Sequence, residues 1–69
     1  IQREIEKMLG ATVKDIYTKK VITITEDTSL EDIATIMSEK KVHLLPVLRG
    51  NELVGVVGKV DVVRVLAKE

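Results

Sequence analysis

Apolar residues near the start of the chain recur every three or four positions, with charged residues between them. Over residues 1–9 this spacing gives one apolar face, which predicts a short amphipathic helix. Gly10 follows at a position suited to ending it. Thr12 then precedes Asp15 by three residues, the spacing of a capping box, and predicts one or two helical turns over residues 13–17.

The next segments change period. Residues 21–24 are β-branched throughout and predict a buried or half-buried strand. Thr28 and Glu31 have the spacing of a second capping box, and an apolar stripe follows them up to a pair of lysines at residues 40 and 41. This pattern predicts a helix that begins near residue 30 and ends at the lysine pair.

The last third of the chain predicts a β-hairpin and a helix. Residues 42–48 and 53–57 are apolar runs separated by a polar turn, which favours two antiparallel strands. Pro46 interrupts the first run, and because proline donates no backbone hydrogen bond it indicates an edge, a bulge or an open N–H side. Residues 59–67 then read as a helix with a broad apolar surface.

This order of elements predicts an α+β fold. A strand–helix–strand unit favours a parallel pair, and the hairpin adds an antiparallel third strand. We expect a three-stranded sheet with two helices on one face and an extra helix at the N-terminus. The expected division is an N-terminal helix or linker over residues 1–11 and one domain over residues 12–69.

Composition excludes several classes of function. Eleven basic residues balance eleven acidic ones, which argues against a nucleic acid or an acidic membrane held by bulk charge. The chain has no cysteine and one histidine, so it lacks a cysteine nucleophile and the ligands of a typical zinc site. No apolar run approaches the roughly 20 residues that cross a bilayer. We expect a cytoplasmic protein that is not an enzyme, and a first residue other than methionine suggests a longer natural chain.

The stretch from residue 53 to residue 61 carries the strongest local signal for a ligand. An apolar strand passes through Gly58 into the last helix, and the backbone N–H groups at a helix start suit an anion or a polar ligand. Asp61 lies about one turn into that helix. The alternative is that Gly58 is only an N-cap and Asp61 only a favourable acid in a first turn.

Five segments of the chain, in order and at matching distances, resemble the cystathionine-β-synthase (CBS) domain family. These are Val13-Lys14-Asp15-Ile16 with Thr18, Val21-Ile22-Thr23-Ile24, Thr28-Ser29-Leu30-Glu31-Asp32-Ile33, Val42-His43-Leu44-Leu45-Pro46-Val47 and Gly55-Val56-Val57-Gly58-Lys59-Val60-Asp61. The last resembles the family signature of a glycine, two apolar residues, a hydroxyl residue, two variable residues and an aspartate. The resemblance covers nearly the whole chain.

The resemblance implies a regulatory module that works in pairs and needs no cofactor or metal. Two copies would pack through sheet and helix surfaces as a homodimer, with AMP, ADP, ATP or S-adenosylmethionine in the cleft. Asp61 would bind the ribose hydroxyls. The adenine would lie among four residues of the first two strands, namely Val21, Ile22, Leu45 and Pro46.

Two positions depart from the family pattern. Gly58 stands where the family has a hydroxyl that touches phosphate, and Leu44 stands where nucleotide-binding members often have arginine. Each missing charge-assisted hydrogen bond would weaken a phosphate contact by roughly 1.5–3 kcal/mol. Backbone N–H groups at Gly58, together with Lys59 and Lys20, would compensate in part. We therefore expect an adenosine ligand that depends less on its phosphate, with a ligand-free dimerisation module as the alternative.

Two further side chains have open roles. Tyr17 either stacks on the adenine or packs at a domain interface with its hydroxyl in water. His43 either donates to a phosphate or is a solvated residue at the start of a strand.

Overall fold

The chain folds as a three-stranded sheet with four helices, as predicted for an α+β domain. The structure, a computed structural model, describes residues 2–68, so Ile1 and Glu69 of the predicted elements and domains lie outside it. In chain order the elements are α1 (Gln2–Leu9), α2 (Val13–Tyr17), β1 (Ile24–Thr25), α3 (Leu30–Lys40), β2 (Leu44–Arg49), β3 (Glu52–Gly58) and α4 (Lys59–Ala67).

The sheet has the order β1-β2-β3, with β1 parallel and β3 antiparallel to the central strand β2. Both pairings confirm the sequence prediction. The antiparallel register shifts between Val47 and Leu48, which marks a bulge. Pro46 lies in the central strand rather than at an edge, at a position before the pairing with β1 begins.

The first strand is much shorter than predicted. The sequence predicted a strand over residues 21–24, but β1 contains only Ile24 and Thr25, which pair with Val47 and Leu48. Residues 21–23 belong to no strand of the described chain, although their β-branched side chains favour β structure. Arg49, the last residue of β2, donates two hydrogen bonds to Glu26, at 2.7 and 3.0 Å. These bonds hold the end of β2 to the loop that follows β1. The same contact lowers the pKa of the Glu26 carboxyl.

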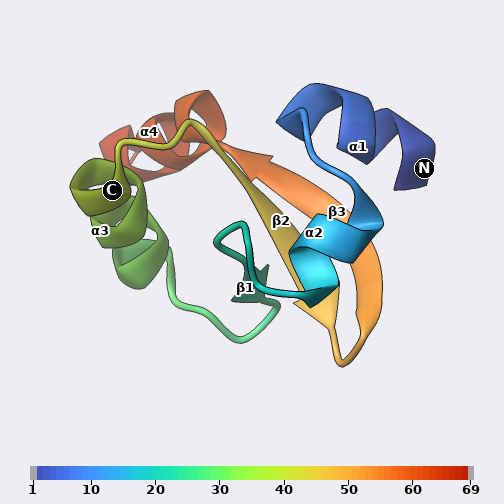
Figure 1. Ribbon diagram of the computed structural model, residues 1–69. Coiled ribbons are helices and arrows are strands. Elements are labelled where there is room, and N and C mark those ends of the chain that lie inside the picture. Colours follow the sequence, from blue (N-terminus) through green and yellow to red (C-terminus); the bar gives the residue numbers. More distant parts are fainter. Residues whose placement is uncertain (1, 69) are drawn as a thin grey trace.

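One face of the sheet is covered by α3 and α4, as predicted (Figure 1). Their apolar stripes bury one side of β1 and β2 in the larger core. Its buried members are Ile24, Ile33, Met37, Leu45 and Val62.

The opposite face is covered by α1 and α2. Ile5 from α1 and Ile16 from α2 pack with Leu53 of β3, and Leu48 and Val56 lie beside them. Figure 1 shows α1 on the side of the sheet away from α3 and α4. The extra N-terminal helix is therefore a layer of the fold.

Local hydrogen bonds explain where the helices begin. The side chain and backbone of Thr12 bond with those of Asp15, which confirms the first capping box, and the Thr12 N–H lowers the pKa of the Asp15 carboxyl. The second capping box, predicted at Thr28 and Glu31, is wrong: Ser29 is the N-cap of α3, and its hydroxyl accepts from the backbone N–H of Asp32. Thr28 instead accepts from the N–H of Thr25.

The backbone conformation at the C-cap of α3 can be tested by substitution with glycine. Lys41 adopts a left-handed conformation with φ 54°, which strains any residue with a Cβ. Lys41→Gly is therefore expected to raise the free energy of unfolding by about 1 kcal/mol. Lys40→Gly, the same change one residue earlier inside the helix, is expected to lower it by about 1 kcal/mol. Urea unfolding measures both, and equal shifts of the two variants would contradict this assignment of the helix end.

Candidate ligand-binding site

A hollow of about 290 Å³ lies between the segment before β1 and the start of β2. We call it the strand pocket. Its lining residues are Leu9, Lys20, Val21, Ile22, Val42, Leu44, Leu45 and Pro46. The structure thus brings together five residues that the sequence assigned to a ligand: Lys20, Val21, Ile22, Leu45 and Pro46.

The strand pocket exists because β1 is short. The parallel pairing begins at Ile24 and Val47, so the chain before Ile24 separates from the first half of β2. Residues 20–22 then form one wall, and residues 44–46 form the other. The peptide groups of residues 21–23 have no ladder partner in the described chain, which leaves them free to bond a ligand.

The chemistry of the strand pocket suits a flat, mostly apolar group. Aliphatic side chains dominate the lining, and Lys20 is the charged residue among them. The volume of about 290 Å³ is near the lower end of the range for small-molecule sites. The strand pocket can therefore take a group the size of a base, while a larger ligand must extend past its rim.

Asp61 and one lining residue of the strand pocket both approach Gly58. A Cβ placed on Gly58 would be 3.5 Å from Cδ2 of Leu44 and 3.6 Å from Oδ2 of Asp61, so both side chains approach the same point. Leu44 also lines the strand pocket, and it therefore links the pocket to the carboxylate. The Asp61 side chain is 71% exposed, and its only ion pair in the described chain is a loose one, 3.8 Å from the Arg64 guanidinium. Its oxygens remain available to hydroxyl donors.

Three other sequence candidates lie outside the strand pocket. His43 is exposed and lines a neighbouring hollow of about 260 Å³ together with Met8, Leu9, Val42 and Leu44. Tyr17 at the end of α2 is 46% exposed and does not line the strand pocket. The Lys59 backbone N–H donates to the His43 carbonyl at 2.8 Å, but the Lys59 side chain extends elsewhere.

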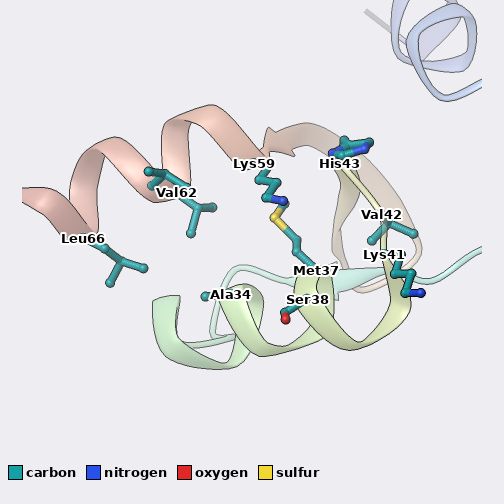
Figure 2. Close-up of a pocket in the computed structure, with 10 residues that line it drawn as sticks. Ala34, Met37, Ser38, Lys41, Val42, His43, Lys59, Val62 and Leu66 are labelled. Atoms are coloured by element: carbon teal, nitrogen blue, oxygen red, sulfur yellow. The ribbon is translucent and has the colours of Figure 1, made fainter.

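A second and larger hollow, of about 430 Å³, lies between α3 and α4. We call it the helix groove. Its lining residues are Ala34, Met37, Ser38, Lys41, Val42, His43, Lys59, Val62, Val63 and Leu66. In Figure 2, Val62 and Leu66 of α4 point toward Ala34 and Met37 of α3, and the Lys59 side chain enters the same space. Most of its lining residues are apolar, and two of them, Val63 and Leu66, are exposed on α4.

Sequence reasoning missed three residues of the strand pocket. Val42 lies before β2, but Leu44 could have been found from the alternation of that strand, because a strand sends alternate side chains to one face and Pro46 was already a candidate. Leu9 could not, because its position in an amphipathic helix signals packing and says nothing of what it packs against.

Two negative findings apply to residues 2–68. Within that range no helix is long and apolar enough to cross a bilayer. In the same range the histidine and the acidic side chains do not gather into a group that could hold a metal ion.

Comparison with known proteins identifies the fold family. CBS domain-containing protein CBSX1, chloroplastic, of Arabidopsis thaliana is 37% identical over 65 residues, which are 93% of this chain and 28% of that protein. CBSX2, chloroplastic, of the same plant is 34% identical over 93% of this chain and 27% of that protein. A Thermotoga maritima protein named "Probable manganese-dependent inorganic pyrophosphatase" is 33% identical over 87% of this chain and 11% of its own length.

The match to this chain therefore spans between 11% and 28% of the length of these relatives. The pattern that defines the CBS domain matches residues 13–68, from the start of α2 to the residue after α4. That match covers most of the chain, and it agrees with the β-α-β-β-α order of the structure. The chain belongs to the CBS domain family.

Proposed function

We propose that this chain is the ligand-sensing unit of a regulatory protein and binds an adenosine compound in the strand pocket. CBS domains are regulatory modules that often bind nucleotides. The observation that carries the proposal is that Leu44 lines an apolar pocket of the size of a base and also approaches Gly58, which the exposed Asp61 carboxylate approaches as well. AMP, ADP, ATP and S-adenosylmethionine all contain a base and a ribose.

Each part of such a ligand has a counterpart in the chain. The adenine would lie between Val21 and Ile22 on one side and Leu45 and Pro46 on the other. Asp61 would accept hydrogen bonds from the ribose hydroxyls, which are stronger when the acceptor is charged. Lys20 and the backbone at Gly58 would be the nearest donors for phosphate, with His43 beyond them.

The proposal also includes pairing of two copies through α4. Val60, Val63 and Val65 are 69%, 55% and 47% exposed, and Val63 also lines the helix groove. A chain of 69 residues without a disulfide gains stability from association. The sheet face opposite α3 and α4 is occupied by α1 and α2, so α4 offers the more accessible surface.

A ligand in such a pair would act by population shift. If the bound base and ribose are held more tightly in one arrangement of the two copies, the ligand favours that arrangement by its difference in affinity. The output domain or partner chain that responds would lie elsewhere in the protein. The expectation of a cytoplasmic location stays a prediction, and two of the relatives are named as chloroplastic.

A ligand-free dimerisation module is the second candidate. It is favoured by Gly58, which gives α4 no side-chain cap and offers no hydroxyl to a phosphate. Leu44, an aliphatic residue at the rim, adds no charge there.

Removal of the carboxylate separates these two candidates. For the wild type, calorimetry with AMP, ATP and S-adenosylmethionine is expected to show saturable binding. Asp61→Asn is expected to weaken it by about 10- to 100-fold, because a hydrogen bond to a charged group contributes roughly 1.5–3 kcal/mol. Asp32→Asn, the same change in the first turn of α3, is expected to have no effect. Wild-type protein that binds none of the three compounds at millimolar concentration would leave the dimerisation module as the function.

A hydroxyl at position 58 tests the proposed path of the phosphate. A serine Cβ there meets only ordinary contacts, and its hydroxyl can cap α4. Gly58→Ser is expected to raise the free energy of unfolding by about 0.5–1 kcal/mol and to strengthen AMP binding about tenfold, with adenosine binding unchanged. Gly58→Ala is the control without a hydroxyl. If serine and alanine change AMP and adenosine affinity alike, the phosphate lies elsewhere.

Sedimentation tests the pairing surface. Val63→Glu places a charge in the exposed apolar surface of α4, and burying an unpaired charge is costly, so the dimer is expected to dissociate. Thr35→Glu adds the same charge at an exposed position of α3 and is expected to leave the dimer intact. A wild-type chain that sediments as a monomer at millimolar concentration would contradict pairing through α4.

A further inference from the structure

The last turn of α1 forms part of the strand pocket. Leu9 lines it opposite the strand residues, and Met8 and Leu9 together line the neighbouring hollow beside His43. The other walls come from residues 20–22, Val42 and residues 44–46, which belong to the matched CBS segment. The match begins at residue 13, so α1 lies before the segment that defines the CBS domain.

Two contacts hold α1 in place. Ile5 is 5% exposed and packs against Ile16 and Leu53, and the Glu6 carboxylate accepts a hydrogen bond of 2.6 Å from the Val13 N–H. The chain then turns at Gly10, which has a φ of 66°, an angle that glycine adopts without strain. The helix is thus attached through one short link, with its docking contacts in its middle and its pocket contact at its end.

A helix of this length depends on its docking. α1 has eight residues, and an isolated helix so short is not stable in water. Its hydrogen-bonded form therefore persists only while Ile5 and Leu9 rest on the sheet. A group bound in the strand pocket would touch Leu9 and add contacts to the docked form alone.

We infer that α1 is a hinged cover of the strand pocket and that Leu9 determines its affinity for the bound base. This inference rests on the proposed adenosine function. Because linkage is reciprocal, a ligand that stabilises the docked helix is itself bound more tightly when the helix is docked. Ligand binding thereby reaches the first helix of the described chain.

Three variants test the contact with AMP as the probe. Leu9→Ala removes the wall and is expected to weaken AMP binding by about tenfold, because the base then buries less apolar surface. Leu9→Trp keeps α1 apolar but fills the hollow, and is expected to abolish binding at millimolar AMP. Lys7→Ala lies on the exposed side of the same helix and is expected to leave the affinity within about twofold. Thermal unfolding without ligand checks that each variant folds.

Hydrogen exchange of the wild type tests the coupling without any variant. Saturating AMP is expected to slow exchange of the backbone amides of α1 by about the same factor as those of residues 20–22. Unchanged exchange in α1 while residues 20–22 are protected would overturn the cover. So would equal AMP affinity of the wild type, Leu9→Ala and Leu9→Trp, and in both cases the proposed function stands. Absence of AMP binding by the wild type would overturn both.

Discussion

The candidate site depends on how briefly β1 pairs with β2. Only Ile24 and Thr25 form the parallel ladder, and the Arg49–Glu26 pair holds the chain just beyond it. One residue earlier the two segments separate, and the strand pocket opens between them. Leu45 is 1% exposed and belongs to the main core, yet it also lines the strand pocket. The packing that stabilises the domain therefore also shapes the place where a ligand would lie.

Much of the fold could be predicted because periodicity and capping are local. The capping box at Thr12, the end of α1 at Gly10, the hairpin and the two-helix face all follow from residues close in sequence. The strand over residues 21–24 could not, because β propensity describes a pleated surface and says nothing of whether a neighbour is in reach. The place where this prediction failed is the place where the strand pocket forms.

Some residues of the candidate site could likewise be assigned from the sequence, whereas the position of others depends on tertiary packing. Residues 20–22 and 45–46 could be assigned through the family resemblance, and the structure brings them together. Lys59 could not be placed, since its direction depends on how α4 packs on α3, and its side chain enters the helix groove instead. Leu9 could not be found either, because α1 reaches the strand pocket only through its tertiary docking. Base and ribose thus have clearer counterparts in the structure than phosphate has.

The measurement that tests this account most directly is a nitrogen–proton correlation spectrum of the labelled protein titrated with AMP. The account predicts that the largest shifts cluster around the strand pocket and the start of α4, at residues 20–22, 44–46 and 61. Shifts that instead cluster in the helix groove, at Ala34, Met37 and Leu66, would contradict it, because the larger hollow would then be the ligand site. A spectrum unchanged at millimolar AMP would contradict it equally.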